Sequence, residues 1–245
     1  MLLLIGFDVW VKHRPNKTRE QGEQMIPDLN VLIIGGNRFV GKLLASKLLA
    51  QGHHLTLLNR GNLDDGFGNR VERINCDRNN TIDLVNAISG RRWDVIYDQL
   101  CFGVKQAEQA CELFKNKTQQ YIFSSSQAVY GLGAQLREEN FNPRKYKILG
   151  VSHDYTKGKQ QAEAYLYAHA PWPVIAARLP IIIGSDEQNG RLAFHLARMR
   201  SEREIFFPTL DAHISLISAE GAADCLAFFL GKEINEPVNC APVES

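Results

Sequence analysis

The sequence has almost no excess of charge of either sign. Its 28 lysine and arginine residues are balanced by 27 aspartate and glutamate residues, which gives a formal net charge of +1. Proteins that bind nucleic acids or membranes through charge need clustered basic residues, so this balance argues against both partners. Internal repeats and low-complexity tracts are also lacking. We expect 245 residues to form one α/β domain, with at most a small appended lobe.

Paired cysteines and metal-ligand spacings are missing too. The five cysteines are scattered and form no Cys-x-x-Cys pair: Cys76, Cys101, Cys111, Cys225 and Cys240. This pattern excludes a disulfide framework and indicates reduced thiols, mostly buried, in a cytoplasmic protein. The seven histidines show no ligand spacing either, so we predict no metal site.

A long hydrophobic run is absent as well. The apolar segment from Met1 to Val11 is too short to span a bilayer, and Asp8 interrupts it. No basic residues precede the segment and no small-residue cleavage site follows it, which argues against a signal peptide. We expect residues 1–29 to be an extension outside the fold, and the protein to have no membrane partner.

Residues 30–61 carry the pattern around which the rest of the chain is organised. Apolar runs at 31–34 and 55–58 predict two buried parallel strands. Between them lie a glycine-rich turn at 35–41 and a segment with helical leucine spacing. This order of strand, turn, helix and strand is the βαβ unit of a nucleotide-binding sheet.

The same alternation continues toward the C-terminus. Further apolar runs predict strands, and helical patterns lie between them, with Thr81 as the expected N-cap of one helix. The expected strands are 71–75, 95–100 and 121–124, and the expected helices are 82–89, 105–115 and 154–169. This alternation predicts a doubly wound parallel sheet, the Rossmann fold.

The glycine turn is suited to a dinucleotide. A pyrophosphate needs backbone N–H groups, no obstructing side chains and the positive end of a helix dipole. The predicted cofactor-binding residues of the turn are Gly35, Gly36, Asn37, Arg38, Phe39, Val40 and Gly41. The alternative is a glycine-rich turn that binds nothing, but the strand before it and the helix after it favour dinucleotide binding.

A second set of residues suggests proton transfer. Ser126 follows the strand at 121–124, and carboxyl ends of parallel strands face one crevice, so it should lie near the glycine turn. Tyr155 and Lys159 are four residues apart and share one helix face. An ammonium stabilises a nearby phenolate, which suits a phenol to act as a base in hydride exchange with a nicotinamide. Alone, this spacing would more often mark a solvated helix face.

Together the motifs resemble the NAD(P)-dependent epimerase/dehydratase family of the extended short-chain dehydrogenase/reductase superfamily. The resemblance spans about residues 30–241 and depends on the order of several motifs. These are GGNRFVG at 35–41, Asp77, SSSQAVYG at 124–131, YTKGK at 155–159 followed by Glu163, and RLP at 178–180. A helix at 189–199 and a strand leading into a helix at 213–230 also look familial.

The resemblance implies roles for individual residues. Ser126, Tyr155 and Lys159 would be the catalytic triad, with Lys159 also holding the nicotinamide ribose. Further cofactor-binding residues would follow the second and third strands: Asn59, Arg60, Asp77 and Arg78. Residues 30–181 would form the dinucleotide-binding core, and 182–245 a reduced substrate lobe mixed with returning strands. Relatives often dimerise through helices equivalent to 105–116 and 154–169, so a homodimer is expected.

The departures from the family pattern are informative. Arg38 stands where the family turn usually has a glycine, as in an atypical subgroup that includes the chloroplast stem-loop-binding proteins. An acidic residue for the 2′-hydroxyl of NAD is missing after the second strand, where Asn59 and Arg60 stand. Arg38 and Arg60 could instead pair with a 2′-phosphate, so we predict NADP over NAD, unless Arg60 merely faces solvent.

Other departures concern the reaction. Gln127 and Ala128 replace the Asp-Glu pair that dehydratases use, so dehydration is not expected. The short C-terminal part leaves three alternatives: a small substrate, a reduced lobe or a fragment. Arg191 or Arg198 could meet a nucleotide diphosphate, although a solvated basic face is an equal alternative.

We therefore expect an NAD(P)-dependent epimerase or reductase acting on a nucleotide sugar or a similar hydroxylated substrate. The alternative is a non-catalytic protein that binds RNA or protein on a dinucleotide-binding scaffold. The near-neutral charge weakens an RNA role, since phosphate contacts need clustered lysines and arginines.

Overall fold

The computed structural model describes residues 28–206 and 214–241. Its centre is a seven-stranded parallel sheet with the strand order β3-β2-β1-β4-β5-β6-β9. The strands are β1 (Asn30–Ile34), β2 (His54–Asn59), β3 (Glu72–Asn75), β4 (Val95–Asp98), β5 (Gln120–Ser126), β6 (Val174–Leu179) and β9 (Pro237–Asn239). The order reverses between β1 and β4, which creates the crevice where doubly wound sheets bind ligands. The predicted Rossmann fold is confirmed.

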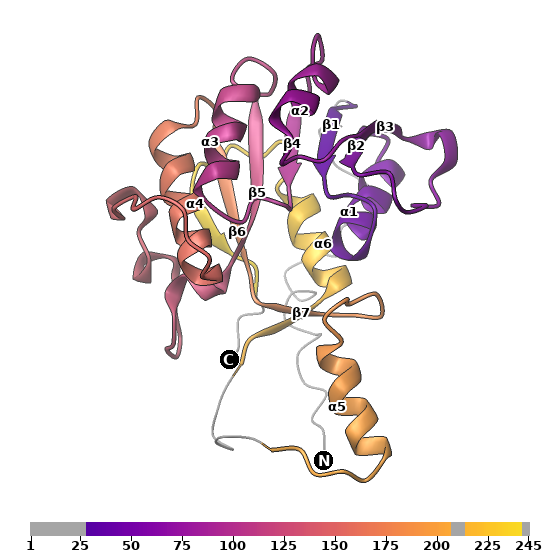
Figure 1. Ribbon diagram of the computed structural model, residues 1–245, viewed down its shortest axis with the longest axis vertical. Helices are drawn as coiled ribbons and strands as arrows, with labels where there is room; N and C mark the ends of the chain where they lie inside the picture. Colours follow the sequence, from indigo (N-terminus) through magenta and orange to yellow (C-terminus); the bar gives the residue numbers. More distant parts are fainter. Residues whose placement is uncertain (1–27, 207–213, 242–245) are drawn as a thin grey trace, which may run out of the picture.

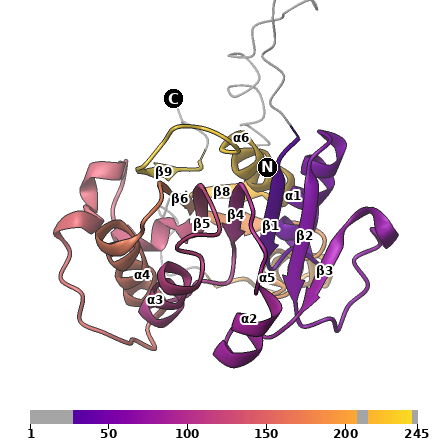
Figure 2. The same ribbon diagram turned by 90° about the horizontal axis from the view of Figure 1, so that it is seen from above.

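Helices cover both faces of this sheet (Figure 2). On one face lie α1 (Phe39–Ala50) and α6 (Ala219–Phe228); on the other lie α2 (Thr81–Ala87), α3 (Val104–Leu113) and α4 (Tyr155–His169). Because both faces are covered, the central strand β1 is apolar at four consecutive positions: Val31 and Ile33 join one core cluster, and Leu32 and Ile34 join the other.

Two local predictions were wrong for identifiable reasons. Thr81 is already helical, and Asn80, with an extended backbone, is the N-cap of α2; its side chain accepts the Asp83 N–H at 3.3 Å. The strand predicted to reach residue 100 ends at Asp98. There the Asp98 carboxylate accepts the Leu100 N–H at 2.9 Å, a side-chain turn that takes the backbone out of the sheet.

The C-terminal part of the chain is divided between two places. β7 (Ile181–Ile183) pairs with β8 (Leu216–Ser218) in a separate two-stranded sheet, and α5 (Arg191–Arg200) projects away from the main sheet (Figure 1). In contrast, α6 and β9 return to the main sheet. This distribution agrees with the mixture expected for residues 182–245, although the domain boundaries themselves stay a prediction.

The remaining expectations concern the termini and the cysteines. Most of the predicted N-terminal extension, residues 1–27, lies outside the described residues, while Leu29 packs against the core. Four cysteines are buried and Cys225 is half-buried, and all are free thiols. In the described ranges, no helix has both the length and the apolar character needed to cross a membrane.

Candidate active site

A cleft of about 570 Å³ lies at the carboxyl ends of the central strands. It brings together the turn after β1, the ends of β2 and β3, the end of β5 and the start of α4. Every predicted site residue except Gly36 lines it: Gly35, Asn37, Arg38, Phe39, Val40, Gly41, Asn59, Arg60, Asp77, Arg78, Ser126, Tyr155 and Lys159. Residues more than 120 positions apart in the sequence thus share one cavity.

The glycine turn is tight enough to exclude side chains. Gly35 has a φ of +93°, which L-residues rarely adopt, and a Cβ on Gly41 would lie 2.2 Å from the Gly35 carbonyl oxygen. Gly36 is the one predicted site residue that does not line the cleft. A Cβ there would lie 2.7 Å from Leu57 Cδ2, so Gly36 lets the turn pack on the sheet and does not line the cleft.

Arg38 reaches across the cleft. It precedes α1, and its side chain makes no capping hydrogen bond. With the Gln188 amide oxygen turned toward it, Gln188 accepts hydrogen bonds from Arg38 Nε at 3.0 Å and Nη1 at 2.6 Å. Gln188 belongs to the segment between β7 and α5, and no motif or strand end marks it in the sequence. The contact connects the glycine turn to the part of the chain that precedes α5.

The end of β2 carries no acid. Asn59 accepts the Gly61 N–H at 2.8 Å through its side chain, which shapes the turn after the strand. The Arg60 side chain is exposed at the cleft and has no carboxylate partner among the described residues. An unpaired guanidinium at this position is available to an anionic ligand.

Arg78 has a partner that the sequence did not reveal. Its guanidinium forms a buried ion pair with Asp98 at the end of β4, and the Tyr121 hydroxyl donates to the same carboxylate at 2.5 Å. The predicted contact of Arg78 with a cofactor therefore involves a side chain that is already held in place. Its Nε, however, is buried without a hydrogen-bond partner in the described part of the chain.

A second unpartnered donor lies nearby. Gln99 Nε2 is buried, has no hydrogen-bond partner among the described residues, and belongs to a residue that lines the cleft. Buried donors without partners are rare, and a ligand rich in acceptors would satisfy them. The cleft therefore fits a dinucleotide, whose ribose and phosphate oxygens are acceptors. Gln99 directly follows β4, so its position at a strand end could have identified it.

Tyr155, Lys159 and Ser126 line the cleft where β5 ends and α4 begins, whereas Arg60 lines it after the end of β2. Tyr155 is the first residue of α4, 52% exposed, and the Asp154 side chain caps the helix by accepting the Lys157 N–H at 2.8 Å. Lys159 Nζ lies 5.9 Å from the centre of the Tyr155 ring. Helix α4 packs closely against the segment after β4 because Gly158 has no side chain. A Cβ on Gly158 would lie 2.4 Å from the Phe102 carbonyl oxygen.

The Lys159 ammonium is held by backbone carbonyls. Nζ donates at 2.8 Å to Cys101 O and at 2.8 Å to Ser124 O, and the side chain is 2% exposed. Burial lowers the pKa of Lys159 from 10.5 to about 8, and the nearby Cys101, Asp98 and Glu163 oppose this shift. The group is therefore close to its protonation midpoint at mildly alkaline pH.

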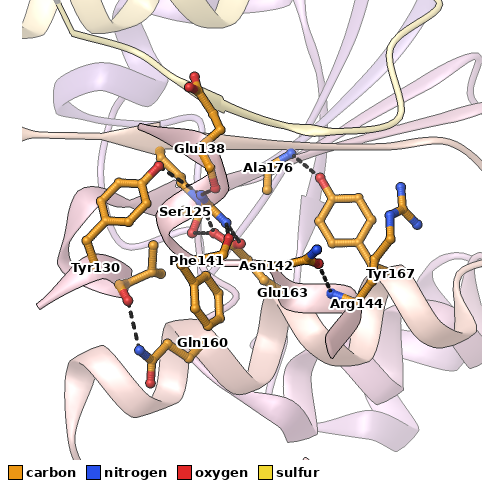
Figure 3. Close-up of polar contacts among 12 residues, drawn as sticks. Ser125, Tyr130, Glu138, Phe141, Asn142, Arg144, Gln160, Glu163, Tyr167 and Ala176 are labelled. Carbon is orange, nitrogen blue, oxygen red and sulfur yellow. Dashed lines mark hydrogen bonds and ion pairs between the residues drawn. The ribbon is translucent and has the colours of Figure 1, made fainter. Parts of the chain in front are cut away.

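The serines at the end of β5 have different partners. The Ser125 hydroxyl donates to Glu163, which is fully buried and does not line the cleft (Figure 3). The Ser126 hydroxyl oxygen accepts the Ala128 N–H at 3.2 Å, which leaves its proton available to a ligand. Ser126 is therefore the better candidate for contact with a substrate oxygen.

A buried polar network supports this arrangement from behind (Figure 3). Arg178 of β6 forms an ion pair with Glu163 of α4 and also donates to the carbonyls of Glu138 at 3.1 Å and Phe141 at 2.9 Å. These carbonyls belong to the segment 132–153, which connects the end of β5 to α4. The loop is therefore fixed to β6 and α4. Of the described residues, no group of three or more His, Cys, Asp or Glu side chains could hold a metal ion.

Comparison with solved structures supports the fold. The Thermotoga maritima UDP-glucose 4-epimerase, solved with UDP-glucose, is 16% identical with a TM-score of 0.69, covering 86% of this chain and 76% of its own. The Bordetella bronchiseptica enzyme WbmG, solved with NAD and UDP, is 15% identical with a TM-score of 0.69, covering 90% and 75%. The Bacillus anthracis dTDP-glucose 4,6-dehydratase, solved with NAD, is 18% identical with a TM-score of 0.70, covering 88% and 76%.

A curated relative is the chloroplast stem-loop binding protein of 41 kDa b from Arabidopsis thaliana. It is 29% identical over 202 residues, which cover 76% of this chain. This chain spans about half the length of that relative, 50%. The model of the NAD dependent epimerase/dehydratase family matches residues 31–241. The chain belongs to the NAD dependent epimerase/dehydratase family.

Proposed function

We propose that this protein is an NAD(P)-dependent oxidoreductase or epimerase that acts on a secondary hydroxyl of a nucleotide sugar or a similar hydroxylated substrate. The observation that carries the proposal is the shared cleft. It is lined both by the glycine turn and by Ser126, Tyr155 and Lys159. A binding site for a dinucleotide and a set of proton-transferring groups therefore face the same cavity.

Each polar side chain at the cleft is assigned a separate chemical role. A bound nicotinamide would supply the carbon that accepts and returns a hydride. Tyr155 would take the proton from the substrate hydroxyl, and Ser126 would donate a hydrogen bond to the same oxygen. Lys159, while protonated, would favour the phenolate of Tyr155 by its positive charge. In epimerisation, Tyr155 would return the proton after the sugar has turned its other face.

The charges at the cleft favour NADP over NAD. Arg38 and Arg60 line it, and no acidic residue follows β2 at the position where a carboxylate would bind the 2′-hydroxyl of NAD. Both guanidiniums can pair with a 2′-phosphate. Arg38 would either give up its hydrogen bonds with Gln188 and bind the 2′-phosphate, or keep these hydrogen bonds while Arg60 alone binds the phosphate.

A nucleotide sugar is favoured as the substrate because solved structures of the same fold contain UDP or UDP-glucose. Epimerisation or simple reduction is favoured over dehydration, because Gln127 and Ala128 carry no group that can shuttle a proton. Dimerisation through α3 and α4 stays an expectation.

The test is product analysis. The purified protein is incubated with NADP or NAD and a panel of UDP- and dTDP-sugars, and the sugar products are followed by proton NMR. The proposal predicts an epimer or a keto sugar with the wild type and a loss of about 10²- to 10⁴-fold in rate with Tyr155→Phe. A panel without any product, or full turnover by Tyr155→Phe, would reject it.

A second candidate function is RNA binding on the same scaffold. It is favoured by the 29% identity to a relative named for stem-loop binding, and opposed by the net charge of +1. Retention of a stem-loop RNA on the immobilised protein, decreasing steeply with salt, would support this function. RNA retention that stays unchanged between low and high salt would contradict this function.

A further inference from the structure

A second cavity, of about 450 Å³, lies at the amino ends of β1, β2 and β3. Because all strands of the sheet run parallel, this is the end opposite to the cleft and to α5 (Figure 1). The two cavities have no lining residue in common. The second cavity is therefore a separate feature that the proposed reaction does not use.

The floor of this cavity consists of four buried residues, three of them apolar: Leu55, Thr56, Val71 and Trp93. The exposed lining of the cavity as a whole is more polar than apolar. Trp93 Nε1 donates to Thr56 Oγ1 at 3.0 Å, which holds the indole in one orientation. A volume of this size is in the usual range for small-molecule sites, roughly 300–1,000 Å³.

The rim of the cavity is basic. Three guanidinium groups, those of Arg70, Arg91 and Arg92, line it, and Glu72 is the one acid among the described residues that do so. Glu72 is already satisfied, because it pairs with Arg91 and accepts the Thr56 hydroxyl at 3.3 Å. The formal charge of these four groups is therefore +2.

Two of the guanidiniums lack an acidic partner. Arg70 donates through Nε to the Phe67 carbonyl at 3.2 Å, but neither Arg70 nor Arg92 forms an ion pair within the described ranges. In a chain with almost equal numbers of acids and bases, unpaired arginines around one cavity indicate an anionic ligand.

We propose that this cavity binds a small organic phosphate monoester. A phosphate monoester carries about −1.5 to −2 charges near pH 7, which matches the formal +2 of the rim. The planar forks of Arg70 and Arg92 can bind phosphate oxygens in pairs. The apolar floor over Trp93 receives the organic part of the molecule, so a monoester binds more tightly than inorganic phosphate.

The test uses the indole N–H signal of Trp93 in nitrogen-15 NMR spectra of the full chain. The chain has three tryptophans, and a Trp93→Phe variant assigns the signal. Phenyl phosphate is the probe, and benzenesulfonate, with one negative charge, is the matched control ligand. We expect phenyl phosphate to shift the Trp93 signal saturably and at least tenfold more tightly than benzenesulfonate, while the Trp172 signal stays unchanged.

Variants of the rim arginines test whether phenyl phosphate binds in this cavity. Arg70→Gln and Arg92→Gln should each weaken phenyl phosphate binding about tenfold or more, whereas Lys147→Gln, at an exposed position outside both cavities, should leave it unchanged. Both arginines are exposed, so these variants are expected to fold. The proposal is overturned if the Trp93 signal does not respond, or if Arg70→Gln and Arg92→Gln both bind as the wild type does.

A titration with RNA distinguishes a small phosphate monoester from the phosphates of a nucleic-acid backbone. A short single-stranded RNA is titrated against the same signal. If the RNA shifts the Trp93 signal and phenyl phosphate does not, the cavity binds a nucleic-acid backbone and the small-molecule proposal is wrong. Neither result depends on whether the cleft holds NADP, so the two proposals can fail separately.

Discussion

Arg178 and Glu163, both fully buried, form a two-point ion pair in which Nε–Oε1 is 3.1 Å and Nη2–Oε2 is 2.6 Å. The pair joins β6 to α4, the helix that carries Tyr155 and Lys159. Through Ser125 it also reaches the strand end that carries Ser126. Two charges that lie far from solvent thus hold the elements that form one side of the cleft.

We predict that Glu163→Gln strongly destabilises the protein. It leaves the Arg178 charge buried without its partner, and such changes cost about 3–5 kcal/mol in free energy of unfolding. Urea unfolding measures the change, and Glu139→Gln, at an exposed position, is the control. Replacing both partners, as in Glu163→Leu with Arg178→Met, should cost less than Glu163→Gln alone. Equal stability of Glu163→Gln and the wild type would contradict this account of the pair.

A second prediction concerns the glycine turn. In Gly41→Ala the new Cβ would lie 2.2 Å from the Gly35 carbonyl oxygen, so the helix must move away from the turn. We expect a loss of stability of about 1–3 kcal/mol and at least tenfold weaker NADPH binding in a fluorescence titration. Gly103→Ala is the matched control, because its Cβ would meet its nearest neighbour, Gln106 Oε1, at 3.7 Å. If the two variants show the same stability and the same NADPH affinity, the close approach of Gly41 to the Gly35 carbonyl is not needed for either property.

The third prediction is a pH dependence of stability. Burial lowers the pKa of Lys159 to about 8, below its ordinary 10.5, so between these pH values the unfolded chain binds the proton and the folded protein does not. Stability then rises with pH in this window, and the cost of burying the ammonium is present in full only below about pH 8. Relative to Lys159→Met, the wild type should gain about 2 kcal/mol between pH 8 and pH 10. Parallel pH profiles of the two proteins would show that the pKa of Lys159 is not lowered.

The fourth prediction tests the choice of cofactor. Arg60→Gln removes a cation that would pair with the 2′-phosphate but has no counterpart in NADH. We expect NADPH binding to weaken about tenfold and NADH binding to stay within about twofold, since a hydrogen bond to a charged group contributes about 1.5–3 kcal/mol. Fluorescence titrations with both dinucleotides measure this, with Lys147→Gln as the control. If NADPH binding and NADH binding are weakened equally, Arg60 does not bind the 2′-phosphate.

The sequence was sufficient for the features that follow from local pattern. Runs such as 31–34 are apolar at every position because parallel strands are covered on both faces, so the sheet could be predicted. Most cleft residues could be predicted as well, because carboxyl ends of parallel strands share one edge. Ser126 was placed near the glycine turn on that basis, whereas Tyr155 and Lys159 were paired by their helical spacing and joined to Ser126 by the family resemblance. All three line one cavity.

The features that were missed depend on long-range contacts. Gln188 meets Arg38 from a segment that carries no motif, and Asp98 pairs with Arg78 across strands. The tight contact of Gly36 with Leu57, which belongs to the neighbouring strand β2, was also not predicted. Such partners are set by the packing of elements that are far apart in the chain, and no spacing in the sequence indicates them.

The central claim is that Tyr155 transfers a proton during hydride exchange in this cleft. The most direct measurement is a rapid-mixing experiment that follows nicotinamide absorbance when the protein, loaded with NADP or NAD, meets a nucleotide sugar. The account predicts reduction of the nicotinamide by the wild type and a rate lower by about 10²- to 10⁴-fold with Tyr155→Phe at unchanged cofactor affinity. Cofactor binding without any reduction across the sugar panel, or equal rates for the two proteins, would contradict it.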